Sequence, residues 1–438
     1  MSSISEDRVL SASAITVVAL VVLVPPAWAL WSAWPGSGSN AAWRIAGQVS
    51  GVAGLSWLLL ALVLSVRVPG WDMPFGGLLR LWRIHHWLGA ASFVALLLHP
   101  LLASLARAAD GPAAVLATLT PPPGYWPVWV GWAALLVMMA FMAPTFSFFG
   151  RPEYQRWKWL HRLSGLAAAL GLLHAWPLTA ALPTPAAFWW WAGLGALATA
   201  AMGWRIALSR WLGRRAYVIT EVTPLAPRVV ELTLAGPPLE HHPGQFVYLT
   251  PFDSLLDAGR GEEHPYTLSS APGEPHLRIA IKDLGDASRA LLDVTPGSRA
   301  AVEGPYGRFL PTASRDPALW IGGGIGMTPF VSAARALDAA GGAVDTHLIY
   351  CANDPSRAYF LAELEAIVRR VDGLVLHAHF FAEEGPLTAA FLAHRVPDLD
   401  QRRVLVCGPQ PLIDLSRALA RDAGVPTSRF LSEEFDLL

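Results

Sequence analysis

The sequence is poor in charged residues. Only 15% of its 438 residues are Asp, Glu, Lys or Arg, whereas 53% are hydrophobic. A soluble domain usually carries about a quarter charged residues, so we expect much of this chain to lie in lipid. The formal net charge is −1, which provides no electrostatic footprint for nucleic acid. We therefore expect a membrane protein with no nucleic-acid partner.

Cysteine is also scarce. Cys351 and Cys407 are the two cysteines of the chain, far apart in its second half. Two such residues do not make a disulfide framework, and neither lies in a pattern typical of zinc or iron–sulfur sites. A reducing, cytosolic setting suits this half of the chain.

The apolar residues are concentrated in the first half. From about Arg214 the sequence has the composition of an ordinary soluble α/β protein. We predict a helical membrane domain over residues 1–213, followed by two soluble domains over 214–313 and 314–438.

Six apolar stretches are long enough to cross a membrane, which takes roughly 20 residues. They are Ala12–Trp31, Ile45–Val66, Ile84–Ala106, Val128–Phe149, Leu160–Ala180 and Ala187–Leu208. Cleavage of the first as a signal peptide is the less favoured alternative, because acidic Glu6 and Asp7 make a poor signal start.

Basic residues predict the orientation of these spans. They are concentrated between spans two and three, between spans four and five, and after span six (Arg67, Arg80, Arg83; Arg151, Arg156, Lys158, Arg162; Arg205, Arg210, Arg214, Arg215). The opposite loops offer only Arg44 and Arg107. We expect a multi-pass protein of the plasma or inner membrane, with the amino terminus and both soluble domains in the cytoplasm.

Five histidines fall in two of the predicted spans. The third span contains His85, His86 and His99, and the fifth contains His161 and His174. Ionisable side chains are costly in hydrocarbon and usually functional there, and imidazole is a good ligand of haem iron. The alternative is a purely structural role, with each histidine bonded to a neighbouring helix.

The spacing of the histidines predicts two layers of ligands. The separations of 14 and 13 residues correspond to roughly 20 Å of helical rise. We predict that His85 pairs with His161 near the inner face and His99 with His174 near the outer face, with one haem for each pair. His86 remains the alternative to His85.

The fifth span needs a local distortion for both of its histidines to face the third span. Thirteen residues leave an ideal helix roughly 140° from its starting face. Gly165 and Gly171 make a kink or bulge plausible.

The second half contains two motifs suited to a flavin. Short alternating runs from Ala216 to Pro311 predict a small antiparallel β-barrel. Within it, the heptad His264-Pro265-Tyr266-Thr267-Leu268-Ser269-Ser270 offers an aromatic face and a hydroxyl. The stretch Ile281–Ser288 reads as a strand that opens a helix, where backbone amides and Lys282 suit a pyrophosphate. His241 and His242 are expected in a solvated turn.

A glycine turn and a second strand end predict a dinucleotide site. The run Leu319–Pro329 contains an apolar strand, four glycines and the start of a helix, and such glycines let a backbone approach a phosphate closely. Further strands alternate with helices, and the last ends at Cys407-Gly408-Pro409. Cys407 either faces a nicotinamide or is a buried thiol at a strand end.

Taken together, these motifs resemble the ferric reductase and NADPH oxidase superfamily along almost the whole chain. The resemblance lies in the two histidine pairs, HPYTLSS, IKDLGDAS, GGGIGMTP, CGP and Glu433-Glu434-Phe435. It implies a six-helix dihaem bundle, an antiparallel β-barrel FAD domain and a doubly wound α/β NAD(P) domain. The implied cofactors are FAD, two b-type haems and NADH or NADPH as donor.

The resemblance also implies roles for individual residues. Those implied to hold FAD are His264, Pro265, Tyr266, Thr267, Lys282, Gly285, Asp286 and Ser288. Those implied to line the NAD(P) site are Gly322, Gly323, Gly324, Gly326, Thr328, Pro329, Cys407 and Gly408. Phe435 is implied to cover the flavin, and Thr267, Cys407 and Phe435 are expected closest to the chemistry.

Some positions depart from the family pattern. Ala287 and Ser288 replace an aromatic residue and a threonine, which would loosen FAD binding. Asn353 stands where an arginine is common, although Arg357 is available to bind a 2′-phosphate. We therefore predict that NADH and NADPH both serve as donors.

The expected activity is electron transfer from cytosolic NAD(P)H across the membrane to a ferric chelate or oxygen. Two alternatives remain open at this point. One is an electron relay to an external redox partner protein, and the other is a non-redox transporter with a reductase-like regulatory domain.

Overall fold

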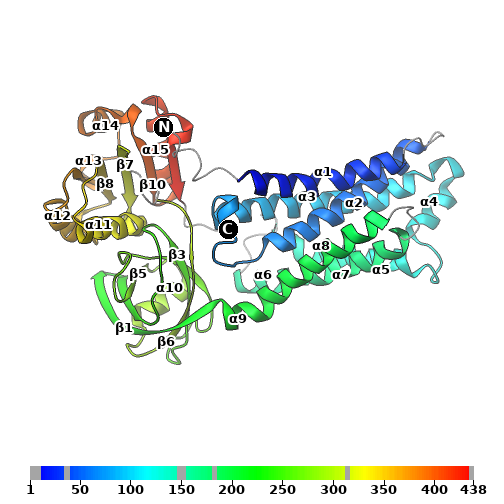
Figure 1. Cartoon of the computed structure of the whole chain (residues 1–438), viewed down its shortest axis with the longest axis horizontal. Helices are drawn as coiled ribbons and strands as arrows, with labels where there is room; N and C mark the ends of the chain where they lie inside the picture. Colours follow the sequence, from blue (N-terminus) through cyan, green and yellow to red (C-terminus); the bar gives the residue numbers. More distant parts are fainter. Residues whose placement is uncertain (1–10, 34–39, 146–153, 180–184, 311–315, 434–438) are drawn as a thin grey trace. The chain divides into compact units, whose positions relative to one another are not determined.

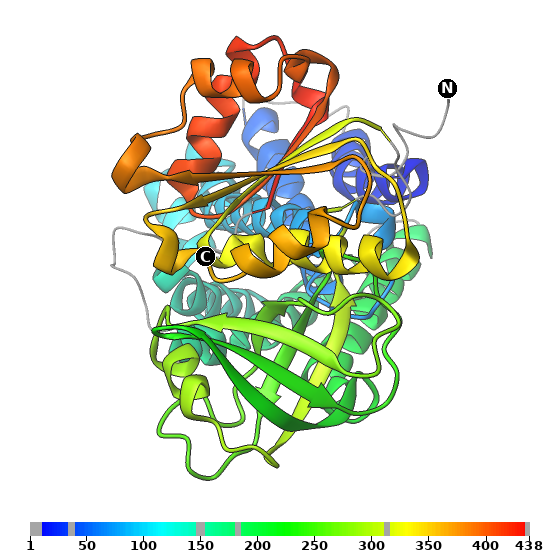
Figure 2. The ribbon, with the colours of Figure 1, turned by 90° about the vertical axis from the view of Figure 1, so that its left-hand side faces the viewer.

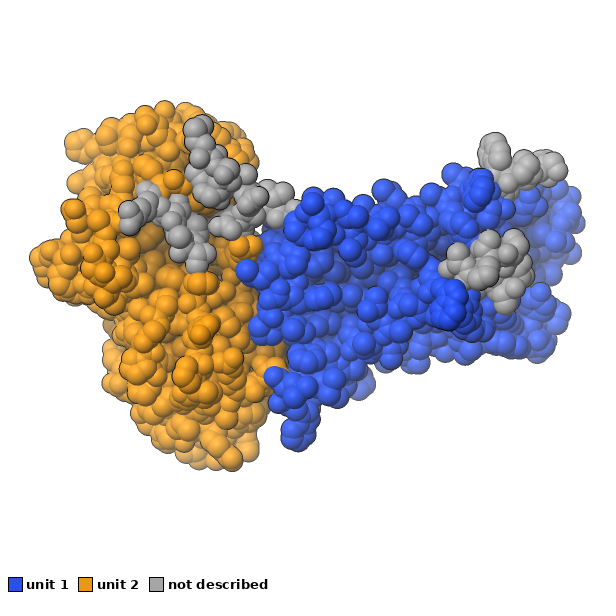
Figure 3. All heavy atoms as spheres, in the orientation of Figure 1, with its two compact units in different colours: residues 1–212 blue, residues 213–438 orange. Residues whose placement is uncertain are grey.

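The structure is a computed structural model that describes residues 11–33, 40–145, 154–179, 185–310 and 316–433. The chain divides into two compact units, Met1–Leu212 and Gly213–Leu438 (Figure 3). The predicted further division of the second unit at residue 313 stays a prediction.

All regular secondary structure in the described residues of unit 1 is helical. Its long helices lie side by side along one direction (Figure 1). The helices are α1 (Ala12–Ala33), α2 (Ala41–Leu64), α3 (Leu78–Leu105), α4 (Pro112–Leu119), α5 (Trp126–Met142), α6 (Tyr154–His161), α7 (Leu163–Thr179), α8 (Pro185–Gly203) and α9 (Ser209–Leu212). A π-helical turn over Trp204–Leu208 joins α8 to α9.

Four segments are long and apolar enough to cross a membrane, judged by length and composition within the described residues. They are Ala12–Ser32, Ala41–Leu64, Leu78–Asp110 and Trp126–Thr145. Helices α7 and α8 cover most of the other two predicted spans, with 17 and 19 residues. The count of six spans therefore stays a prediction.

Helix α2 is the most buried of the long helices, and small residues let α3 approach it closely. A Cβ added at Gly47 would lie 3.0 Å from the backbone nitrogen of Ala103, and one added at Gly54 would lie 2.7 Å from Leu96. Close backbone approach over small residues is a common way to join helices in lipid. It places α2 directly beside the helix that carries three of the histidines.

Unit 2 begins with a curled antiparallel sheet, drawn in green in Figure 2. Its strands are β1 (Arg214–Ala226), β2 (Val229–Ala235), β3 (Phe246–Pro251), β4 (His264–Thr267), β5 (Leu277–Lys282) and β6 (Arg299–Tyr306), in the order β4-β3-β6-β1-β2-β5. An antiparallel bridge between Leu268 and Ile279 joins the two edges and closes the sheet into a barrel. Alternating apolar residues such as Ile219, Leu232 and Leu249 fill its interior.

A parallel sheet follows in the chain. Its strands are β7 (Ala318–Gly323), β8 (Thr346–Ala352), β9 (Leu374–Phe380), β10 (Arg403–Cys407) and β11 (Phe430–Glu433), in the order β11-β10-β7-β8-β9. The helices between them are α11 (Thr328–Ala340), α12 (Leu361–Val368), α13 (Phe381–Glu384), α14 (Ala389–Arg395) and α15 (Gln410–Asp422). The strand order reverses between β7 and β10, where open α/β sheets bind ligands.

Candidate functional site

Two pairs of histidine rings face each other inside unit 1. The ring centres of His85 on α3 and His161 on α6 are 6.1 Å apart, with an angle of 67° between the ring planes. The rings of His99 on α3 and His174 on α7 are 6.2 Å apart at 74°. These are the two pairs that the sequence spacing predicts.

The separation of the rings fits an iron ion held between them. An imidazole nitrogen lies about 1.1 Å from its ring centre and about 2.0 Å from a bound metal, so two axial rings facing across one ion have centres about 6.2 Å apart. Among the described residues there is no group of three or more His, Cys, Asp or Glu side chains that could hold a metal ion. Two-histidine sites suit an ion whose other ligands belong to a porphyrin.

Three of the four rings are oriented by backbone carbonyls. The Nδ1 atoms of His85, His99 and His174 lie 2.7 Å from the carbonyl oxygens of Ala61, Gly47 and Pro127, respectively. When Nδ1 carries the proton and donates it to a carbonyl, Nε2 keeps its lone pair. Metal-binding histidines usually have this tautomer, fixed by a hydrogen bond from the other ring nitrogen.

His161 is held differently. Its Nδ1 is buried without a hydrogen-bond partner in the structure. Instead, the ring stacks on Trp157 at 4.9 Å and meets the edge of Phe141 at 5.3 Å. Aromatic packing rather than a carbonyl fixes this ring.

Exposure and helix geometry bear on two further points that the sequence leaves open. His86 is exposed, whereas the adjacent His85 faces His161, so the geometry favours His85 as the ligand. The distortion expected in the fifth span lies at Arg162, between α6 and α7, where i→i+3 backbone bonds replace the helical pattern. It precedes Gly165 and Gly171, the two glycines that suggest a distortion in the sequence, by three and nine residues.

Glycines make room for the outer pair of rings. A Cβ at Gly51 on α2 would lie 2.6 Å from Nδ1 of His99, and a Cβ at Gly131 on α5 would lie 2.7 Å from Nδ1 of His174. Real Cβ atoms do not approach so closely, so each histidine depends on a glycine of a neighbouring helix. Sequence spacing provided no signal for these two positions.

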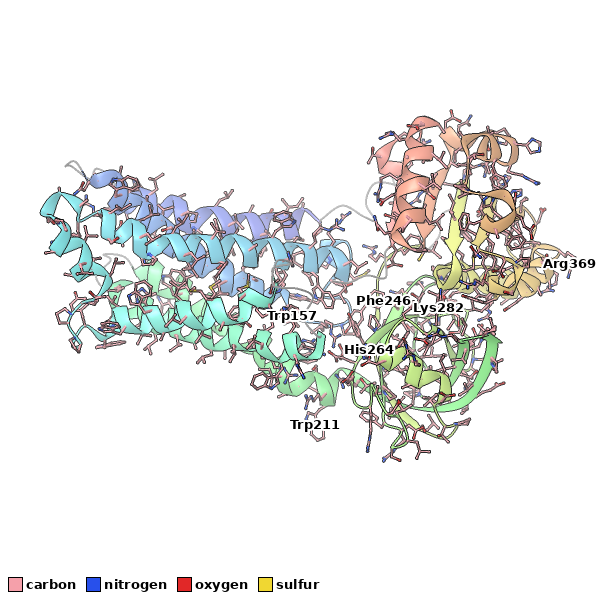
Figure 4. The ribbon with its side chains drawn as sticks, turned by 180° about the vertical axis from the view of Figure 1, so that it is seen from behind. Trp157, Trp211, Phe246, His264, Lys282 and Arg369 are labelled. Carbon is pink, nitrogen blue, oxygen red and sulfur yellow. The ribbon has the colours of Figure 1, made fainter. Side chains whose placement is uncertain are left out.

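The predicted flavin heptad lies on β4 and just after it. Thr267 is buried opposite Phe246 on β3, while His264, Pro265 and Tyr266 are partly buried. Nε2 of His264 lies 3.3 Å from the Glu262 carboxylate. Figure 4 labels Phe246, His264 and Lys282 on the barrel.

The predicted pyrophosphate segment connects β5 to the short helix α10 (Asp286–Ala290). Lys282 is the last residue of β5, and Gly285 precedes the helix. The Ser288 hydroxyl accepts the Leu284 amide and donates to the Gly285 carbonyl, and the Asp286 carboxylate accepts the Ala287 amide. The four predicted residues Lys282, Gly285, Asp286 and Ser288 thus lie on one strand–turn–helix segment.

Two arginines that sequence patterns did not reveal pair with Asp283, which lies in this segment. The Asp283 carboxylate is 3% exposed and pairs with Arg228 and Arg289. Hydrogen bonds and charge from these two guanidinium groups lower the pKa of Asp283. Arg228 has a positive φ in the β1–β2 turn. The local sequence does not predict this conformation.

The predicted nicotinamide residues meet at the reversal point of the parallel sheet. Gly322 and Gly323 end β7, and Gly324 has a φ of +57° with no atom near its missing Cβ. A Cβ at Gly326 would lie 2.4 Å from the carbonyl oxygen of Cys407 and 2.7 Å from the Cα of Gly408. The glycine turn is thus pressed against the end of β10. Thr328 and Pro329 begin α11 immediately afterwards.

Cys407 is the last residue of β10, and whether its thiol faces a nicotinamide stays a prediction. It is fully buried, and burial together with the nearby Glu433 carboxylate raises its pKa well above the ordinary value. The thiol therefore stays neutral near pH 7. Phe435, the residue implied to cover the flavin, lies outside the described residues.

Arg357 has an acidic neighbour, and its role in binding a 2′-phosphate stays a prediction. It lies in the exposed turn Pro355–Arg357, and its Nε is 3.6 Å from the Asp354 carboxylate. The same carboxylate accepts from the Asn353 side chain and from the Ser356 amide. A negative group therefore lies between Asn353 and Arg357 at the end of β8.

Sequence reasoning missed a buried ionic network in unit 2. Arg335 on α11 pairs with Glu231 on β2 and with Glu363 on α12. His241, expected in a solvated turn, is instead buried, with Nε2 3.3 Å from the Ser270 carbonyl. Arg335 falls in an ordinary helical stretch, and a local sequence pattern cannot show that it is buried.

Comparisons with known proteins match three consecutive parts of the chain. Residues 50–172 match the family described as "Ferric reductase like transmembrane component". Residues 216–309 match "FAD-binding domain", and residues 320–418 match "Oxidoreductase NAD-binding domain". The order is the one that the sequence resemblance predicted.

Individual relatives are similar over about half of this chain. The stachydrine N-demethylase reductase subunit Stc4 of Rhizobium meliloti (strain 1021) is 31% identical over 247 residues, covering 52% of this chain and 68% of that protein. The glycine betaine monooxygenase reductase subunit of Pseudomonas aeruginosa (strain UCBPP-PA14) is 32% identical over 207 residues, covering 44% and 56%. The chain thus spans between about half and two thirds of the length of these relatives.

Among solved structures, the FAD/NAD-binding domain of a nitric oxide dioxygenase from Vibrio cholerae O1 biovar El Tor is similar to this chain. It is 21% identical with a TM-score of 0.46, and the match covers 50% of this chain and 98% of that one.

Proposed function

Because the chain belongs to the ferric reductase-like superfamily, as a membrane oxidoreductase with FAD- and NAD-binding domains, we propose that it moves electrons from cytosolic NAD(P)H through FAD and two bis-histidine haems to an acceptor outside the membrane. The proposed acceptor is a ferric chelate or oxygen. When bound, FAD converts a two-electron hydride into single electrons and haem carries them one at a time.

The observation that carries this proposal is the pair of histidine couples in unit 1. Both couples have the ring separation that one iron requires, and three of the four rings are oriented by backbone carbonyls. If these histidines hold the iron from both sides, they would leave no site on it open to an acceptor, and no protein side chain would need to coordinate the acceptor.

The residues of unit 2 are suited to binding and orienting the donor side. The glycine turn after β7 leaves its backbone free to approach a phosphate, and Lys282 adds positive charge near the start of α10. Partial burial raises the pKa of the Tyr266 phenol, so this ring stays neutral and available as an apolar wall.

A relay to an external protein partner is the second candidate, and the relatives favour it. The two relatives described above are named as reductase subunits, one of a demethylase and one of a monooxygenase. The third alternative, a non-redox transporter, is disfavoured because all three matched families belong to redox proteins.

An optical experiment on the purified full chain tests the proposal. We expect a haem Soret band, its reduction by NADH under anaerobic conditions, and rapid reoxidation by air or ferric citrate. A purified protein without a Soret band would contradict the haem assignment. Complete reduction followed by slow reoxidation with both acceptors would favour the relay.

A further inference from the structure

Helix α11 connects the two halves of the donor side. It starts at Thr328, directly after the glycine turn of β7, and lies between the parallel sheet and the barrel (Figures 1 and 2). Whatever fixes α11 on the barrel therefore also fixes the glycine turn.

Arg335 makes the central attachment. Its side chain is 7% exposed. Nη1 donates to the Glu231 carboxylate at 2.9 Å and to the Ser269 carbonyl at 2.9 Å, both on the barrel. Nε and Nη2 donate to the two Glu363 oxygens at 2.6 and 2.8 Å, on α12. One side chain thus bonds the barrel, α11 and α12 together.

A second attachment lies one helical turn earlier. The Ser332 hydroxyl donates to the Ser270 carbonyl at 2.7 Å, and both serines are fully buried. The Ser269 hydroxyl donates to Glu231 at 2.6 Å. Ser269 and Ser270 follow Thr267 by two and three residues, so α11 holds the end of the predicted flavin heptad.

The buried charges in this network are paired. Arg335 lies between two carboxylates, and Glu231 also has Arg278 at 3.6 Å. Buried charges are retained only when they are paired and hydrogen-bonded, and removing one partner leaves the others uncompensated. A planar guanidinium supplies donors in several fixed directions, which an ammonium group cannot do.

We propose that Arg335, together with Ser332, is a positioning residue for hydride transfer, because it sets the register between the flavin-binding strand and the nicotinamide-binding turn. The inference rests on the proposed function of unit 2. In that step the nicotinamide C4–H bond breaks, the hydride carries two electrons to the flavin, and a new N–H bond forms there. The reduced nicotinamide is oxidised, and the flavin is reduced and takes up a proton from solvent. Arg335 does not touch either reacting group.

The test measures flavin reduction by NADH in the full chain, by anaerobic stopped-flow at saturating NADH and with only the FAD-loaded fraction counted. We expect Arg335→Lys to slow the reduction about tenfold or more, since small misplacements of reacting groups are costly. Ser332→Ala should slow it about threefold. Both variants should keep their FAD, and with NADH deuterated at C4 both should show an isotope effect at least as large as the unmodified chain.

Arg370→Met is the matched control. Arg370 pairs at 2.6 Å with Asp338, which lies on α11, the helix that also carries Arg335. The Arg370 side chain is 55% exposed, and this ion pair does not involve the barrel. Reduction at the unmodified rate is expected in this variant.

Two results would overturn the proposal. One is an unmodified reduction rate in FAD-loaded Arg335→Lys. The other is loss of FAD from both Arg335→Lys and Ser332→Ala, which would show a role in folding only. A failure of NADH to reduce the flavin in the unmodified chain would instead contradict the proposed function itself.

Discussion

His174 on α7 and His99 on α3 face each other with ring centres 6.2 Å apart, although 75 residues of sequence separate them. Each ring is also bonded through Nδ1 to a backbone carbonyl of another helix, α5 for His174 and α2 for His99. Four helices therefore cooperate to present one pair of nitrogens. Such a constellation is sensitive to changes that a single structural histidine would tolerate.

The two layers of histidines should be separable by mutation. We expect His174→Ala to remove the outer haem and leave the inner pair, so that NADH still reduces the flavin and one haem. Reduction of external acceptors should collapse, because the electron stops about 20 Å short of the outer layer. Conversely, His161→Ala should leave an outer haem that dithionite reduces and NADH does not.

The exposed neighbour His86 provides the control for this experiment, and His86→Ala should keep both haems. Equal haem loss and equal loss of NADH-driven reduction in His161→Ala and His174→Ala would refute the layered arrangement.

The glycine beside His99 should matter as much as the ligand. The Cβ of Gly51→Ala would lie 2.6 Å from the His99 ring, and relieving such overpacking typically costs about 1–3 kcal/mol. We expect the ratio of haem to FAD, measured by the pyridine haemochrome and by flavin absorbance, to fall from two toward one. Gly193→Ala on α8 has open space around its Cβ and should keep both haems. An unchanged ratio of haem to FAD in Gly51→Ala would mean that α2 can shift enough to accommodate the added methyl group.

Nicotinamide preference should respond to Asp354. Its carboxylate engages both Asn353 and Arg357 and would repel a 2′-phosphate. We expect Asp354→Ala to raise kcat/KM for NADPH several-fold, while the value for NADH changes little. Steady-state kinetics with both donors measures this. The control is Asp338→Ala, which removes another arginine pair of unit 2. An unchanged ratio between donors would exclude Arg357 from the phosphate site.

The stability of unit 2 should fall in acid through Glu231. Burial raises the pKa of this carboxyl, but the hydrogen bonds and charges of Arg335, Ser269 and Arg278 outweigh burial and hold it below its ordinary value of 4.5. The Glu231 carboxyl therefore binds a proton more tightly in the unfolded chain than in the folded one. This contribution is complete above about pH 4.5 and is lost as the pH falls through the lower folded pKa.

Release of FAD fluorescence on heating, measured between about pH 3 and pH 6, follows this transition. The pH dependence should be weaker in Glu231→Gln than in the unmodified chain. Identical slopes in the two proteins would show that other carboxyls dominate acid unfolding.

The sequence alone specifies a helical membrane part, the superfamily and the two histidine pairs. These properties depend on composition and on spacing along single helices, because hydrocarbon excludes charge and a helix repeats regularly. The glycine turn of β7 and the end of β10 are likewise local signals. Their meeting follows from the usual topology of such sheets.

Only the tertiary structure decides the residues that act across elements. Gly51 and Gly131 are ordinary helix glycines until another helix brings a histidine against them. Arg335 becomes buried only because β2 and α12 each supply a carboxylate. The sequence predicts a distortion in the fifth span, but only the structure places it at Arg162. Such positions are selected by long-range packing, in which each residue's environment comes from segments far away in the chain, so no local pattern reveals them.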